Sequence, residues 1–154
     1  MKILFKETLL MEVLVKSESG FRFSATCRGH TVTAGRGEDG NTERDGMWPA
    51  QLFEASLGMC IGAYIVKYCN EQKIPYDDLT IELSRRLETS SSPATSADDK
   101  RTRTAKINAR IRLGEKLSPQ QQQDILNAAS LCHITRSIEE GIEIICSLAE
   151  FDDG

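Results

Sequence analysis

The sequence has no CxxC pair, and its five cysteines are an odd number for a chain of 154 residues. Secreted disulfide scaffolds and structural zinc sites use even, closely spaced sets of cysteines. We therefore expect neither class, and we expect no metal and no cofactor. In a reducing compartment, a disulfide formed by such cysteines is more often transient and catalytic than structural.

An excess of positive charge is also missing. The chain has 19 Lys and Arg against 23 Asp and Glu, for a net charge of −4. A basic field that attracts nucleic acid is therefore not expected. No apolar run approaches the roughly 20 residues that a membrane helix needs, so a membrane partner is not expected either.

The N-terminal residues resemble no export signal. They carry Glu7 and lack a small-residue cleavage site, so the chain is expected in the cytoplasm. Met11 is an alternative start. We expect a single domain over residues 1–154, with residues 1–10 as an N-terminal extension.

Hydrophobic periodicity predicts an α+β fold. Alternation of apolar and polar residues indicates strands, and Pro49 and Ser118-Pro119 mark the starts of helices. The predicted elements, in chain order, are short strands between Glu12 and Ala34, a helix from Pro49 to about Glu71, strands Leu79–Glu88 and Thr104–Leu113, helices Gln120–Ala129 and Cys132–Glu140, and a last strand Ile142–Leu148. Polar segments at 35–46 and 89–100 are predicted loops. The two middle strands are expected to pair antiparallel with one solvated face.

The long helix is apolar on nearly every side, which is typical of a buried helix. In a chain this short, burial on every side suggests that a partner subunit supplies some of the cover.

Two cysteines lie in distinctive surroundings of small residues. Cys60 ends the run Ala55-Ser56-Leu57-Gly58-Met59-Cys60, and Cys132 lies in Ala128-Ala129-Ser130-Leu131-Cys132-His133. Two thiols held rigidly in this way could act as attacking and resolving thiols, because the thiolate is the nucleophile and a sulfenic acid is trapped by a nearby thiol. The alternative is that each is a small core residue, since free cysteine is among the most buried residue types.

The remaining candidates carry weaker signals. Cys69 follows Cys60 by about half a helical turn in angle, so it should face away and be structural. Cys27 and Cys146 lie in strand-like stretches and are expected to be structural too. His133 is adjacent to Cys132 but should point away from it and stay exposed. This adjacent Cys-His pair is the only sequence signal that would favour a metal site.

The arrangement resembles the OsmC/Ohr family of thiol-dependent hydroperoxide reductases and their uncharacterised relatives. The resemblance is carried by Pro49-x-x-Leu52-x-x-Ala55-Ser56-Leu57-Gly58-x-Cys60 and by Cys132-x-Ile134-x-x-Ser137-Ile138, and the order of elements matches over roughly 11–148. It implies antiparallel sheets wrapped around a long central helix in an intertwined dimer, with two sites at the interface.

The resemblance also implies a mechanism. The Cys60 thiolate would attack an organic hydroperoxide and become a sulfenic acid, Cys132 would condense with it to a disulfide, and a dithiol would reduce the pair. The expected partners are therefore an organic hydroperoxide, a dithiol reductant and a second copy of the chain, in defence against oxidative stress.

One departure from the family pattern affects this mechanism. The peroxidase branches carry a glutamate directly after the motif proline, where it orients an active-site arginine; here that position is Ala50, and Glu54 lies one turn further on. The family arginine cannot be aligned onto any one residue of this chain. The candidates that precede the helix are Arg22, Arg28, Arg36 and Arg44.

Two hypotheses follow for function. The first is a cytoplasmic, dimeric cysteine peroxidase. The alternative is an OsmC-like dimeric scaffold that binds a small apolar ligand without efficient peroxidase activity. Ala50 favours the alternative, and the retention of both cysteines favours the first.

Overall fold

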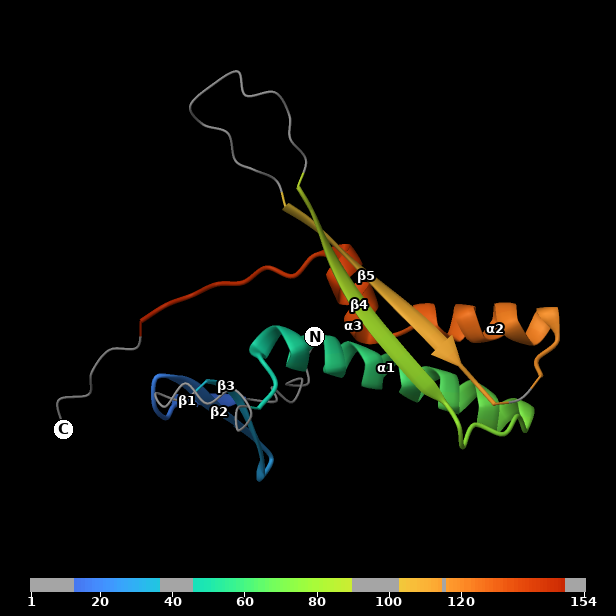
Figure 1. Cartoon of the computed structure of the whole chain (residues 1–154), viewed down its shortest axis with the longest axis horizontal. Helices are drawn as coiled ribbons and strands as arrows, with labels where there is room; N and C mark the ends of the chain where they lie inside the picture. Colours follow the sequence, from blue (N-terminus) through green and yellow to red (C-terminus); the bar gives the residue numbers. More distant parts are fainter. Residues whose placement is uncertain (1–12, 37–45, 90–102, 115, 149–154) are drawn as a thin grey trace, which may run out of the picture. The chain divides into compact units, whose positions relative to one another are not determined.

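The computed structural model describes residues 13–36, 46–114 except 90–102, and 116–148, and its elements confirm the predicted α+β class (Figure 1). The residues 1–10, Arg44, most of the segment 35–46, nearly all of the loop 89–100 and the last six residues lie outside this part. The elements are β1 (Leu14–Ser17), β2 (Phe21–Cys27), β3 (His30–Arg36), α1 (Pro49–Gln72), β4 (Thr80–Thr89), β5 (Arg103–Arg112), α2 (Pro119–Ser130) and α3 (His133–Glu140). The chain divides into two units, 1–54 and 55–154.

The first unit contains an antiparallel three-stranded sheet in the order β1-β2-β3. Phe23 pairs with Ala34 and with Ser17, and Ala25 pairs with Val15 and Val32. Paired residues share one face of a sheet, so the aromatic and aliphatic side chains gather on the same side. That side is largely uncovered: Phe21 is 71% exposed and Val15 58% exposed.

The core of the second unit is a stripe along α1. Leu57, Ile61, Ile65 and Cys69 are buried at intervals of four residues, which places them on one face of the helix. Ile125 of α2 and Cys132 join this core. The single chain does not cover α1 on every side: Met59 is 70% exposed and Phe53 43% exposed. Burial of these positions by a partner subunit stays a prediction.

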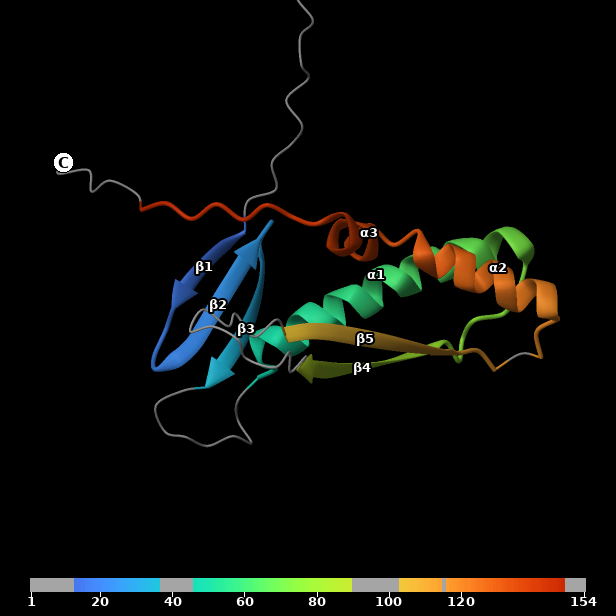
Figure 2. The same cartoon turned by 90° about the horizontal axis from the view of Figure 1, so that it is seen from above.

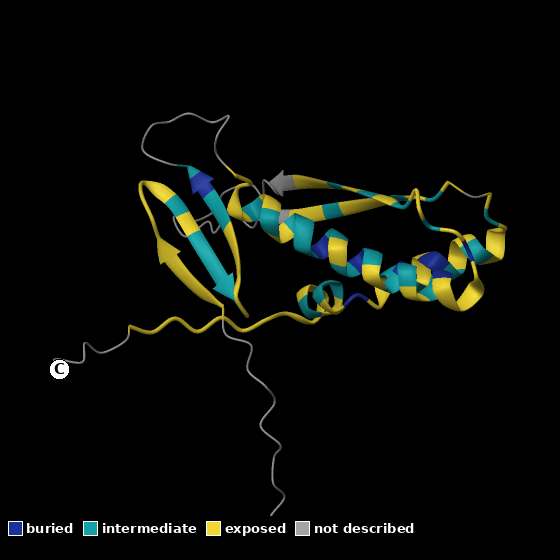
Figure 3. Ribbon diagram, turned by 90° about the horizontal axis from the view of Figure 1, so that it is seen from below, coloured by how far each residue is buried: buried dark blue, intermediate teal, exposed yellow. Residues whose placement is uncertain are grey.

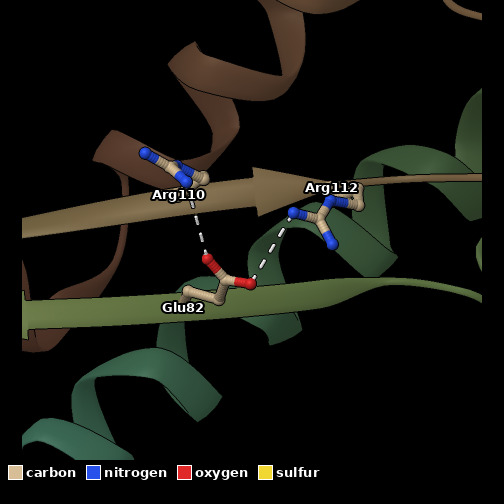
Figure 4. Close-up of polar contacts among 3 residues, drawn as sticks. All are labelled: Glu82, Arg110 and Arg112. Carbon is tan, nitrogen blue, oxygen red and sulfur yellow. Dashed lines mark ion pairs between the residues drawn. The ribbon is translucent and has the colours of Figure 1, made fainter.

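The predicted antiparallel pair β4–β5 is confirmed, with Ile81 opposite Ile111 and Leu83 opposite Ala109. Figure 2 shows α1 between this pair and the helices α2 and α3. The outer face is solvated, and there Glu82 lies 3.9 Å from Arg110 and 3.7 Å from Arg112 (Figure 4). Ion pairs this exposed contribute little to stability, so the inner apolar face positions the strands.

Both short helices begin where the sequence predicts. Ser118 caps α2 in a capping box, accepting from the backbone N–H of Gln121 while the Gln121 side chain accepts from the backbone N–H of Ser118. A break at Leu131 follows, and Cys132 is the N-cap residue of α3. Gly141, with φ +85°, ends α3, a conformation that glycine adopts without strain.

The predicted last strand, Ile142–Leu148, is wrong. This segment is assigned to no strand and has no strand partner among the described residues. It is exposed along its length (Figure 3), with Ile144 82% and Leu148 98% exposed. The apolar pattern is present, but the single chain offers it no sheet edge.

Helix α1 meets a membrane-span criterion that the apolar runs of the sequence had not suggested. Within the described residues it is the one helix long and apolar enough to cross a membrane, by length and composition only. Core helices pass the same test, and α1 buries its Leu57–Cys69 stripe against the other elements of its unit.

Candidate functional site

The structure brings Cys60 and Cys132 together. Cys60 lies in the fourth turn of α1 and is partly exposed, whereas Cys132 is fully buried at the start of α3. Their thiols lie close enough for each to affect the pKa of the other. We call these two side chains the thiol pair.

The small residues noted in the sequence let β4 approach α1 closely beside Cys60. A Cβ added at Gly58 would lie 2.8 Å from Cδ1 of Leu83, and one at Gly62 would lie 3.4 Å from Cδ1 of Ile81. Because α1 packs against β4 at these two glycines, packing fixes where Cys60 lies relative to β4.

The N-terminus of α3 lies beside both sulfurs and acts on their pKa values. The backbone N–H groups of Ile134 and His133 act to lower the pKa of Cys60, and Thr135 and Ile134 act to lower that of Cys132. Cys132 itself makes no side-chain capping bond to α3. A helix N-terminus favours a nearby thiolate, because its first N–H groups have no intrahelical partners.

The environment shifts the pKa values of the two thiols in opposite directions. Burial raises the pKa of Cys60, and the neighbouring Cys132 raises it further, although the N–H groups of Ile134 and His133 oppose the change. Burial also acts to raise the pKa of Cys132, but Cys60, Thr135 and Ile134 outweigh it, so the pKa of Cys132 is lowered.

Thr135 is the residue that sequence reasoning missed. It occupies the third position after the N-cap Cys132, where a polar side chain commonly reaches back to the start of a helix. Cysteine is not a usual capping residue, so the spacing alone did not single out Thr135.

The other candidates lie apart from this chemistry. Cys69 is fully buried, and burial raises its pKa. Cys146 is exposed, so the expectation that it is structural finds no support in its burial. Cys27, at the end of β2, is partly buried. His133 is exposed, and its ring meets Tyr64 edge-on with the ring centroids 5.7 Å apart.

An arginine is not among the groups that most affect the Cys60 pKa within the described residues. Of the candidate arginines, Arg22 pairs with Glu18 at 3.4 Å, Arg28 lies in the turn after β2 with φ +51°, and Arg36 ends β3. All three arginines belong to the first unit.

A cleft of about 380 Å³ is lined in part by Thr135, and neither Cys60 nor Cys132 is among its lining residues. Its lining is mostly apolar, with Thr135 and Glu139 as polar members. The remaining lining residues are Leu57, Ile61, Leu83, Ala105, Ile107, Ala109, Ala129 and Ile138. Within the described part of the chain, no three His, Cys, Asp or Glu side chains gather as metal ligands.

Comparison with known proteins places this geometry in a family. The OsmC-like protein family matches residues 40–147, whereas no curated protein matches the sequence.

Solved structures share the fold at low identity. An OsmC-like protein from Mycoplasma pneumoniae is 13% identical, with a TM-score of 0.60 over 84% of this chain and 86% of that one. The organic hydroperoxide resistance protein OsmC from Legionella pneumophila is 16% identical, with a TM-score of 0.57 over 85% of this chain and 91% of that one. The organic hydroperoxide resistance protein OhrB of Bacillus subtilis is 20% identical, with a TM-score of 0.55 over 83% of this chain and 90% of that one. The fold is shared, and the family match spans most of the chain; the protein belongs to the OsmC-like family.

Proposed function

We propose that this protein reduces organic hydroperoxides through Cys60 and Cys132, in the cytoplasm and in defence against oxidative stress. The observation that carries the proposal is the proximity of the two thiols at the N-terminus of α3, where each affects the pKa of the other. The names of two proteins of the same fold, from Legionella pneumophila and Bacillus subtilis, refer to organic hydroperoxide resistance, which supports this substrate class.

The roles of the two thiols follow from their exposure. Cys60 is partly exposed and can meet a peroxide, whereas Cys132 is fully buried. The Cys60 sulfur attacks the distal peroxide oxygen, the O–O bond breaks, and an alcohol leaves after taking up a proton. Cys132 then attacks the sulfenic sulfur, the S–O bond breaks, and hydroxide leaves as water after protonation.

The cycle needs a dithiol to restore the reduced state. Two thiols of the reductant exchange with the Cys60–Cys132 disulfide and are themselves oxidised to a disulfide, so two electrons return to the pair. A dithiol is preferred, because its second thiol closes a ring and releases the protein quickly.

The expected homodimer is part of this proposal. The apolar side of the β1–β3 sheet and the segment Ile142–Leu148 are both uncovered in the single chain. Uncovered apolar surface of this kind marks sites of association. A second copy of the chain would cover this surface.

Loss of cumene hydroperoxide in the presence of a dithiol tests the proposal. We expect Cys60→Ser to reduce turnover to the rate of the dithiol alone. Cys132→Ser should slow turnover at least about tenfold while still consuming one equivalent of peroxide, leaving a sulfenic acid that dimedone traps. Cys146→Ser, an exposed thiol outside the pair, is the matched control and should turn over normally.

The cleft beside Thr135 favours a second candidate function, the binding of a small apolar ligand. Its volume and apolar lining suit such a molecule. A wild-type protein that shows no turnover above the dithiol alone, and that carries an apolar molecule in native mass spectrometry, would contradict the peroxidase and favour this alternative.

A further inference from the structure

A second cleft, of about 540 Å³, lies between the end of β5, the segment that follows it and the first half of α2. Polar groups come from three of the residues that line it, Arg112, Lys116 and Gln122. The apolar lining residues are Ile111, Leu113, Leu117, Ile125 and Leu126. Neither Cys60 nor Cys132 is among the lining residues, so the cleft is separate from the thiol pair.

Two contacts fix the segment between β5 and α2 that forms one wall of this cleft. The side-chain amide of Gln122 donates to the backbone carbonyl of Leu117 at 3.2 Å. Gly114 lies so close to Asp78 that an added Cβ would be 2.7 Å from the carboxylate Oδ2. The wall is therefore held in place without a ligand, which reduces the ordering cost of binding.

The charge of the cleft is positive. Arg112 and Lys116 each contribute one positive charge, and none of the described residues that line the cleft is acidic. Glu82 lies 3.7 Å from Arg112, with side chains 58% and 65% exposed. An ion pair this exposed is weak, so Arg112 can bind a second carboxylate at little cost.

The rest of the lining is apolar, and part of it faces solvent. Ile125 is 3% exposed, whereas Leu126, the next residue of α2, is 56% exposed. A nonionic apolar molecule would leave both cations unused, and a small polar anion would leave the leucines uncovered. The lining therefore fits a molecule with one anionic end and an apolar chain.

We propose that this cleft binds a free fatty acid of medium chain length. Its carboxylate would lie between Arg112 and Lys116, since the planar fork of arginine matches the two oxygens of a carboxylate. Its alkyl chain would cover Leu117 and Leu126. The volume is within the range of about 300–1,000 Å³ that is usual for small-molecule sites. Binding breaks no bond, and it is independent of whether the protein reduces hydroperoxides.

Isothermal titration calorimetry on the full-length protein tests the site, with decanoate below its micelle-forming concentration as the probe. We expect saturable binding of one decanoate per chain. Decan-1-ol has the same chain without the charge and should bind at least about tenfold more weakly, by the loss of charge-assisted hydrogen bonds. The affinity for decanoate should fall as salt is added, because the two cations are exposed. Cys60→Ser should bind decanoate as the wild type does.

Substitutions separate the two cations from a general effect of charge. Arg112→Gln and Lys116→Gln should each raise the dissociation constant of decanoate about tenfold. Arg110→Gln is the matched control: Arg110 lies on the same strand, 3.9 Å from the same Glu82 (Figure 4), but does not line the cleft. Its affinity should equal that of the wild type. Thermal unfolding checks that the variants, all at exposed positions, remain folded.

Three results would overturn the proposal. They are the absence of saturable decanoate binding, equal affinities for decanoate and decan-1-ol, and an equal loss of affinity in Arg110→Gln and Arg112→Gln. Vesicles of phosphatidylglycerol provide a further arm. A protein that sediments with them and does not bind free decanoate would use these cations at a membrane surface, which would also contradict a fatty-acid site.

Discussion

Cys69 illustrates how differently this chain uses chemically identical side chains. It lies on the buried stripe of α1, fully inaccessible to solvent, and burial raises its pKa. Its role is that of a small apolar residue. Nothing at this position favours a charge, in contrast to Cys132, whose pKa is lowered beside the N-terminus of α3.

Cys69→Ser tests this structural role. The substitution places a hydroxyl in an apolar core, which should lower the free energy of unfolding by about 1–3 kcal/mol, measured by urea denaturation under reducing conditions. Peroxide turnover at a temperature where both proteins are folded should change little. Cys146→Ser is the control, since Cys146 is exposed; equal losses in the two variants would contradict the role of Cys69.

The candidate site could be predicted at the level of residues but not of charge. The motif around Cys60 and the setting of Cys132 predicted two neighbouring thiols, and the structure brings them together. The opposite directions in which the two pKa values shift depend on burial and on the N-terminus of α3 beside both sulfurs. That proximity arises only in the folded chain, so the sequence alone could not resolve it.

At the scale of elements, two glycines show how closely α1 and β4 approach. A side chain at Gly62 would meet Ile81 at an ordinary contact distance, 3.4 Å, whereas one at Gly58 would meet Leu83 at 2.8 Å. Alanine is favoured over glycine within a helix by about 1 kcal/mol. Alanine at position 62 should therefore stabilise the protein, whereas alanine at position 58 first has to displace the side chain of Leu83.

We expect Gly62→Ala to raise the free energy of unfolding by about 0.5–1 kcal/mol. The free energy of unfolding of Gly58→Ala should be lower than that of Gly62→Ala by about 1 kcal/mol, because the Leu83 side chain has to shift. Chemical denaturation of both variants beside the wild type measures the difference. Equal stabilisation by the two would mean that the approach of β4 to α1 does not depend on Gly58.

Helices and strands were predictable where the partners that their hydrophobic pattern requires lie in the same chain. The alternation in β4 and β5 matches their observed pairing, and Ser118-Pro119 marks the start of α2. Ile142–Leu148 has the composition of a strand and still forms none in the described structure. A strand needs a partner edge to bond its backbone, and sequence periodicity does not say whether that edge belongs to the same chain.

At the scale of the whole molecule, each of the two units leaves apolar side chains uncovered in the single chain. In the first unit it is one side of the β1–β3 sheet, where Phe21 and Val15 are exposed; in the second it is the segment Ile142–Leu148. Monomeric proteins rarely leave such surface open in two places. The two surfaces would both become inaccessible in an intertwined dimer.

The double substitution Ile144→Asp with Ile145→Asp tests that dimer. These side chains are 82% and 81% exposed in the single chain, so their replacement should leave the fold intact. If they are buried between copies, their loss should remove about 3 kcal/mol or more of association free energy and raise the dissociation constant at least about 100-fold. Sedimentation velocity over a concentration series measures this dissociation constant.

Glu143→Gln, on the same exposed segment, is the matched control and should leave the dimer unchanged. A wild-type protein that sediments as a monomer, or a double variant that dimerises normally, would show that this segment has another role. Peroxide turnover that falls as the dimer dissociates would connect the interface to Cys60.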